Sequence, residues 1–158
     1  MPSPLRYVLL GLLAVLAQWL VFDRLRIFGA YPDVVLLYVA FLGFREGRLA
    51  GAIAGFSLGL LVDAVHGSWG VHMLIKTVMG FAVGFFSPQD NRDAGPLRTG
   101  QLMLAALMIA LLHNGLLVIF YVVQAGTRNA FMIGALWIGA ALYTAAVAGI
   151  ATLFAPAR

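Results

Sequence analysis

The chain has 158 residues, of which 63% are hydrophobic and 10% are charged, and its mean hydropathy is +0.98. Soluble domains are about 45 to 50% apolar, so this composition excludes an ordinary soluble protein and indicates a membrane protein with several spans. The absence of cysteine excludes disulfides and thiolate chemistry, and the net charge of +4 comes from scattered arginines, which do not form the basic cluster expected for nucleic-acid binding.

Six apolar blocks predict an all-α membrane protein, a six-transmembrane-helix bundle forming one integral membrane domain over residues 1–158. We expect the helices at about 5–24, 31–44, 47–66, 69–87, 99–124 and 130–154. Crossing about 30 Å of hydrocarbon takes about 20 residues, so the second helix is short, or bent at Pro32. We expect the first helix to be retained, because no clean small-x-small cleavage site precedes Asp23.

The distribution of arginines predicts the orientation. If the N-terminus is cytoplasmic, the inner loops and termini carry Arg6, Arg45, Arg48, Arg92, Arg98 and Arg158. The outer loops then carry Arg24, Arg26 and Arg128. The positive-inside rule therefore favours N- and C-termini that both lie in the cytoplasm.

In the third helix, small residues recur every four positions and lead in the same register onto an acid. The series is Gly47, Gly51, Gly55, Gly59 and then Asp63. Each step of four advances about 400° around a helix, so the stripe drifts by about 40° per step and forms a slanted groove. Such a groove lets another backbone approach closely in lipid, and Gly80 and Gly84 repeat the spacing in the fourth helix. The pattern leaves open whether the helix in the groove belongs to this chain or to a partner.

Two ionisable residues, Asp63 and Lys76, lie inside predicted spans. Charges at such depth normally face a partner or water, so they are functional hypotheses by default. We expect an Asp63–Lys76 ion pair that holds the third and fourth helices together. The alternatives are a lysine that snorkels alone, a contact to a partner or ligand, and transport chemistry.

Histidines occupy two places, and neither predicts a metal or a catalyst. His66 and His72 flank the turn after the third helix, but their spacing does not resemble a zinc motif, and interfacial histidines explain them better. His113 and Asn114 lie in the middle of the fifth helix, where an interhelical hydrogen bond is a simpler role than a proton relay. With no nucleophile elbow and no phosphate-binding loop, we expect no enzyme, no catalytic residues and no cofactor.

One ordered set of residues resembles the rod shape-determining protein MreD family. Pro32 and Asp33 open a short apolar helix, and the run from Arg45 through Arg48 to Gly51 leads into the glycine stripe and Asp63. The turn Gly67-Ser68-Trp69-Gly70 completes the set. The resemblance covers about residues 32–84, and the remaining helices match in hydropathy and length.

This resemblance implies a non-enzymatic membrane scaffold of the bacterial cell-elongation complex, the elongasome, in the cytoplasmic membrane. Family members associate with the bitopic protein MreC and, through it, with the MreB filament, the SEDS glycosyltransferase and its transpeptidase, and so control lateral peptidoglycan synthesis and cell shape. The positions carried over are Pro32, Asp33, Arg48, Gly51, Gly55, Asp63, Gly67 and Gly70, none with an implied catalytic role. We expect the single helix of an MreC-like partner to bind in the small-residue groove. Whether the chain also forms a homo-oligomer is left open.

The family is also similar in architecture to the S-components of energy-coupling factor transporters. This similarity provides the alternative function, a substrate-binding subunit of a vitamin transporter. Such a subunit needs an outward cavity with converging polar groups, and only Asp63, His66, His72 and Lys76 could supply them.

Overall fold

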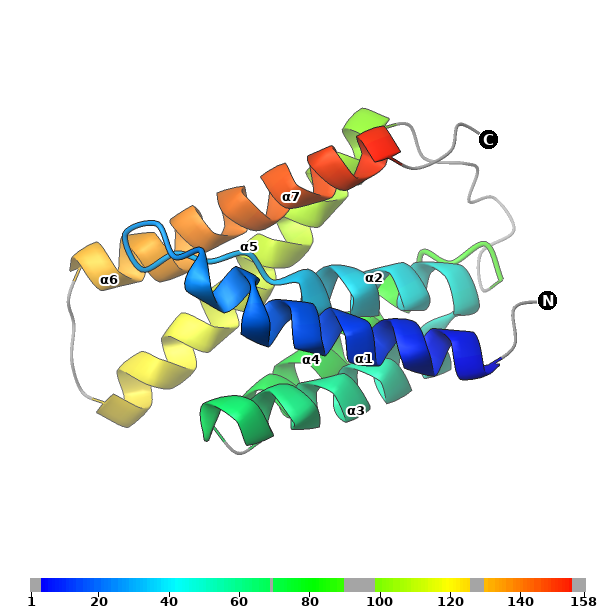
Figure 1. Ribbon diagram of the computed structural model, residues 1–158, viewed down its shortest axis with the longest axis horizontal. Helices are drawn as coiled ribbons and strands as arrows, with labels where there is room; N and C mark the ends of the chain where they lie inside the picture. Colours follow the sequence, from blue (N-terminus) through cyan, green and yellow to red (C-terminus); the bar gives the residue numbers. More distant parts are fainter. Residues whose placement is uncertain (1–3, 69, 90–98, 126–129, 155–158) are drawn as a thin grey trace. The chain divides into compact units, whose positions relative to one another are not determined.

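The helices of the computed structural model follow the apolar blocks of the sequence (Figure 1), and the structure describes residues 4–68, 70–89, 99–125 and 130–154. The elements are α1 (Pro4–Leu20), a 3-10 turn (Phe22–Arg24), α2 (Val34–Glu46), α3 (Arg48–His66), α4 (Val71–Gly84), α5 (Thr99–Ala125), α6 (Ala130–Gly134), a π-helical turn (Ala135–Gly139) and α7 (Ala140–Phe154). The last three are consecutive and form one helix with a π-helical interruption. Over the described residues, the predicted all-α class with six helices is confirmed.

Within the part of the chain that the structure describes, four segments are long and apolar enough to cross a membrane. They are Pro4–Arg24, Arg48–His66, Gly100–Val123 and Ala135–Thr152. By contrast, α2 has 13 residues and α4 has 14, which corresponds to roughly 20 Å of helix each.

The fourth helix is shorter than the range expected from the sequence, 69–87. It begins after Gly70, whose φ of 92° lies in the left-handed region. At its other end, Phe85, Phe86 and Ser87 continue in tight turns, with backbone N–H groups bonded to carbonyls three residues earlier. The backbone before a proline is biased away from the helical region, so Pro88 explains why the helix does not continue.

The chain divides into two compact units, residues 1–24 with 34–95 and residues 25–33 with 96–158. The first unit contains α1 to α4. Its core gathers around α2, where Val35 and Val39 are fully buried against Val15 of α1 and Leu58 of α3. Short connections make α2 and α3, and then α3 and α4, neighbours in space as well as in sequence.

The second unit pairs α5 with α7 and includes the segment 25–33. In that segment Ile27 and Ala30 exchange two backbone hydrogen bonds of 2.9 Å around a two-residue turn. The π-helical turn carries Trp137, whose indole N–H donates to the carbonyl of Leu111 on α5 at 3.0 Å. This hydrogen bond joins the π-helical turn to the neighbouring helix.

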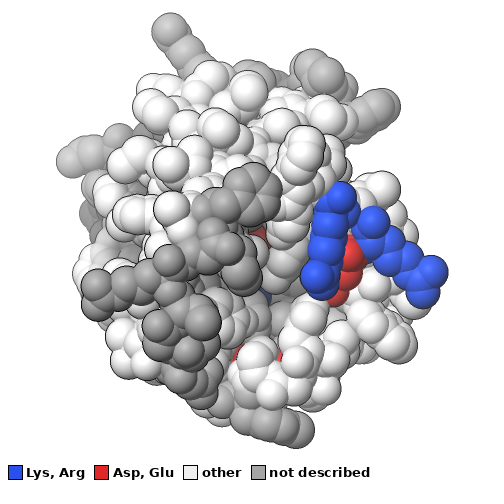
Figure 2. Space-filling view, turned by 90° about the vertical axis from the view of Figure 1, so that its left-hand side faces the viewer, with Lys and Arg blue, Asp and Glu red and all other residues white. Residues whose placement is uncertain are grey.

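Charged side chains take up little of the described surface on one face of the molecule (Figure 2). On the face drawn in Figure 2, Lys and Arg gather in one group beside an acidic patch, and the other described residues are mostly uncharged. Large apolar side chains such as Leu13, Ile53 and Leu112 are more than half exposed. Exposed apolar helix faces of this kind suit a lipid environment.

Candidate functional site

The glycine stripe of α3 lies against the backbone of α4. A Cβ atom added to Gly51, Gly55 or Gly59 would come within 3.0 Å of α4 backbone atoms, a separation that real Cβ atoms essentially never show. The contacts run in order along the crossing, with Gly51 at Gly80, Gly55 at Lys76 and Gly59 at Met73. The slanted groove is therefore filled by a helix of the same chain.

The glycines of α4 complete this contact. A Cβ on Gly80 would meet the carbonyl of Gly51, and one on Gly84 would meet the backbone of Arg48. Gly47 acts differently, because it precedes α3 with a φ of 88° and so supplies the turn between α2 and α3. The Arg48 guanidinium lies 4.9 Å from the centroid of the Phe85 ring, within the range of a cation–π contact.

Asp63 is fully buried and closes the α3–α4 turn with four hydrogen bonds. One carboxylate oxygen accepts from the Ser68 hydroxyl and the His72 N–H, both at 3.0 Å. The other accepts from the N–H groups of Gly70 at 3.0 Å and Met73 at 2.9 Å. Three of the four donors are backbone N–H groups at the start of α4, which have no partner within their own helix. A carboxylate from α3 thus caps α4, where the helix dipole also favours negative charge.

Two glycines give the turn the shape that Asp63 needs. Gly67 ends α3 with a φ of 70°, and its N–H donates to the backbone carbonyl of Asp63. Gly70 precedes α4 with a φ of 92°. Both values lie in the left-handed region that favours glycine, so these two family-pattern positions have a conformational role. Lys76 is fully buried in α4, and its ion pair with Asp63 stays a prediction.

A second polar group in the first unit joins His66 to Gln18 and Asp23, which the sequence did not mark as candidate site residues. The side chain of Gln18 donates to the Asp23 carboxylate at 2.8 Å and accepts from the N–H of Val34 at 2.8 Å. His66 contacts the other Asp23 oxygen at 2.8 Å and the carbonyl of Val62 at 3.0 Å. Gln18 is a polar residue inside an apolar helix, and this position is the sequence signal that could have pointed to the group.

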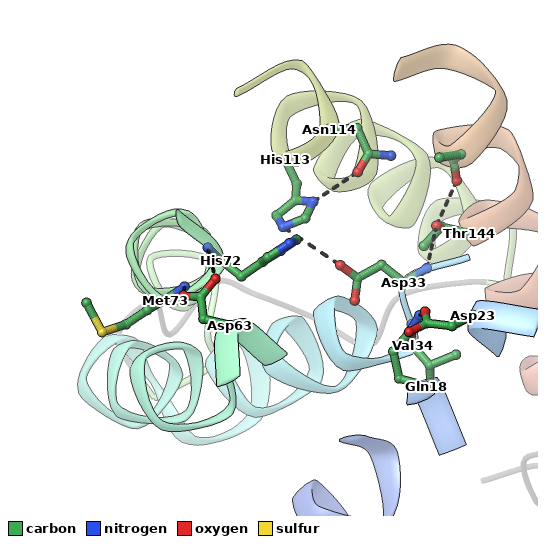
Figure 3. A network of polar contacts seen from close by, with 11 residues as sticks. Gln18, Asp23, Asp33, Val34, Asp63, His72, Met73, His113, Asn114 and Thr144 are labelled. Carbon is green, nitrogen blue, oxygen red and sulfur yellow. Dashed lines mark hydrogen bonds and ion pairs between the residues drawn. The ribbon is translucent and has the colours of Figure 1, made fainter. Parts of the chain in front are cut away.

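The second unit holds a buried polar cluster around Asp33 (Figure 3). The backbone N–H of Asp33 donates to the Thr144 hydroxyl at 3.0 Å, and that hydroxyl donates to the carbonyl of Ala140 at 2.8 Å. His113 lies with one ring nitrogen 3.8 Å from the Asp33 carboxylate and the other 3.0 Å from the Asn114 side-chain oxygen. The fold thus joins a family-pattern residue to the polar pair of the fifth helix.

Pro32, the remaining family-pattern residue, is fully buried and directly precedes Asp33 in the sequence. Among the residues that the structure describes, no three His, Cys, Asp or Glu side chains lie so that they could hold a metal ion. The rings of His66 and His72 lie 5.9 Å apart, centroid to centroid.

An apolar groove of about 570 Å³ lies between α1, α2 and α3. Its lining includes the small residues Gly11, Ala50 and Ala54. Toward one end, the Tyr7 hydroxyl donates to the Glu46 carboxylate at 2.5 Å, and both residues contribute to the lining. We call this surface the α1–α3 groove.

Several residues used for the predicted orientation lie outside the described residues. They are Arg92, Arg98, Arg128 and Arg158. Trp69 of the predicted turn also lies outside the described residues.

The profile of the family described as rod shape-determining protein MreD matches residues 3–155, nearly the whole chain. The chain therefore belongs to the MreD family, as its resemblance over residues 32–84 indicated, and is a shape-determining integral membrane protein. This family is not a known enzyme family. No curated protein and no solved structure matches the chain.

Proposed function

We propose that this MreD-family chain is a non-enzymatic scaffold of the cell-elongation complex that binds the single membrane helix of an MreC-like bitopic partner. Through that partner it would act with an MreB-like filament, a SEDS glycosyltransferase and a transpeptidase on lateral peptidoglycan synthesis. Family membership supports the role in cell shape. The observation that carries the binding proposal is the α1–α3 groove.

The glycine stripe cannot receive the partner helix while α4 fills it. The closest atoms to Gly51 and Gly55 belong to α4 and α2, so a second helix would have to displace the chain's own packing. The α1–α3 groove, by contrast, is an apolar depression bounded by two helices long enough to span the membrane. We therefore assign the partner contact to this groove.

The lining of the groove suits a helix in lipid. Helix association in a bilayer depends on close van der Waals packing, because lipid and apolar side chains are equally hydrophobic. Ala50 and Ala54 leave room for a partner's side chains to approach the α3 backbone. The space at Gly11, by contrast, is filled by Leu58 and Tyr38 of this chain. At one end, Glu46 lies 3.3 Å from the Arg45 guanidinium and could contact a polar residue that flanks the partner span.

The proposed orientation has both termini in the cytoplasm. It places the end of the groove at Tyr7 and Glu46 on the cytoplasmic side, where Arg6 and Arg45 also lie. The partner's filament-binding side and its synthase-binding side would then lie at opposite ends of the groove.

Co-purification of the full chain with its MreC-like partner tests the proposal. Ala54→Trp inserts an indole into the groove, and we expect it to weaken partner binding at least tenfold. The matched control is Ala64→Trp, also on α3, at a residue that does not line the groove. We expect the control to bind as the wild type does.

Thermal unfolding of both variants separates lost binding from lost folding. If folded Ala54→Trp binds the partner as tightly as the control, the groove assignment is wrong. A vitamin-sized ligand bound in stoichiometric amount to the purified chain would instead favour the transporter alternative and contradict the scaffold. A second copy of the chain in the groove would show as a dimer that Ala54→Trp dissociates.

A further inference from the structure

The polar cluster of the second unit contains a buried amide donor that needs an acceptor. Asn114 is 5% exposed, and among the described residues its side-chain nitrogen has no hydrogen-bond partner. Its oxygen is engaged by His113, and Figure 3 shows the amide nitrogen directed away from that ring. A buried donor left without an acceptor costs about 1 to 3 kcal/mol, so native proteins rarely keep one.

A small cavity lies beside this amide. Its volume is about 30 Å³, and it is lined by Tyr31, Asp33, Asn114, Leu117, Val118, Tyr121, Leu136 and Ala140. One water needs roughly 10 to 15 Å³ of such space together with polar partners. The cavity therefore has room for a water and is too small for an organic ligand.

We propose that this cavity binds one buried water molecule, which accepts a hydrogen bond from the Asn114 amide and donates one to the Asp33 carboxylate. Both side chains line the cavity and come from segments far apart in the chain, the 25–33 segment and α5. The water links the 25–33 segment to α5 and gives the Asn114 amide nitrogen its acceptor.

Water fits the site with either orientation of the amide. In the orientation found, the nitrogen faces the cavity and water accepts its proton. If the amide is reversed, its oxygen faces the cavity, and water donates to it instead. A bare cation cannot accept a hydrogen bond from the amide nitrogen, so it fits only the reversed amide, whose oxygen faces the cavity. The aliphatic half of the lining also gives a cation no oxygen ligands. The chemistry thus selects a molecule that both donates and accepts.

A high-resolution map of the full chain in lipid tests the proposal. We expect a density peak 2.7 to 3.2 Å from the Asn114 amide nitrogen and within hydrogen-bonding distance of the Asp33 carboxylate. Leu117→Phe fills the cavity, and we expect it to remove the peak and lower the melting temperature. Leu116→Phe is the matched control, because Leu116 is the adjacent residue on α5, is 42% exposed and does not line the cavity. It should retain the peak.

Three results would overturn the assignment. The first is a wild-type map in which the cavity is empty or the Asn114 amide donates to a protein atom. The second is a peak that binds thallium(I), which would identify a cation. The third is a peak that survives in folded Leu117→Phe. The wild-type map alone decides the question if Leu117→Phe does not fold.

Discussion

Replacing Asp63 with asparagine tests whether the carboxylate caps α4. The substitution keeps the size of the side chain and changes one of its two oxygens into an NH₂ group, which cannot accept a hydrogen bond. Four donors now converge on the two oxygens, so the amide cannot satisfy all of them. We expect the α3–α4 turn to be destabilised.

The magnitude follows from the best arrangement open to the amide. If its nitrogen faces Ser68, the serine hydroxyl can reverse and accept, and only the His72 N–H loses its acceptor, at about 1 to 3 kcal/mol. The bonds from Gly70 and Met73 remain but lose a charged acceptor, at about 1 kcal/mol each. The sum is about 3 to 5 kcal/mol. Since a neutral amide is also easier to bury, we expect a loss near the lower value, about 3 kcal/mol.

Reversible unfolding of the purified chain in mixed micelles, followed by circular dichroism, measures this loss. Ser68→Ala is the control, because it removes one donor together with its bond and leaves the three backbone N–H groups capped. We expect it to cost about 1 kcal/mol or less. If Asp63→Asn unfolds within about 0.5 kcal/mol of the wild type, or no more easily than Ser68→Ala, the capping role is refuted.

Three further tests of the hairpin use the same unfolding assay. Gly55→Ala places a Cβ against the Lys76 backbone and should lower the free energy of unfolding by about 1 to 3 kcal/mol or more. Gly134→Ala, whose Cβ meets nothing within 4 Å, should not lower it, and equal effects would contradict the close contact. Gly67→Ala should cost about 1 to 2 kcal/mol because φ there is 70°, and an asparagine that is no better tolerated than alanine would argue against this cause. A double-mutant cycle of Asp63→Asn with Lys76→Met should show a coupling above about 0.5 kcal/mol if the predicted ion pair exists, and additive losses would rule the pair out.

The features that could be predicted from the sequence are those that depend on the length of apolar blocks and on residue spacing. The apolar blocks indicated six helices because helix length and hydrophobic thickness are linked in a membrane. The spacing of Gly51 and Gly55 indicated a crossing backbone, since only a missing Cβ permits such an approach. Spacing carries no information about which helix crosses, so the assignment of α4 to the groove required the structure.

The partners of the acids were harder to predict. For Asp63, charge alone suggested Lys76, whereas the four bonds observed come from the turn and the start of α4, whose N–H directions depend on two left-handed glycines. Asp33 and Thr144 are 111 positions apart, and no repeat in the sequence connects them. Contacts of this kind depend on tertiary packing, so the cluster around Asp33 was outside the reach of local patterns.

The cap formed by Asp63 also bears on the order in which the chain folds. All four of its hydrogen bonds join residues five to ten positions apart, so the loop that must close is very short. Closing a loop of about ten residues takes on the order of 10 to 100 ns, far less than the assembly of distant helices. We therefore expect α3 and α4 to insert into the bilayer together as a preformed hairpin, so that the carboxylate enters hydrocarbon already surrounded by its donors. The charge would then oppose insertion much less than an isolated aspartate in a single helix.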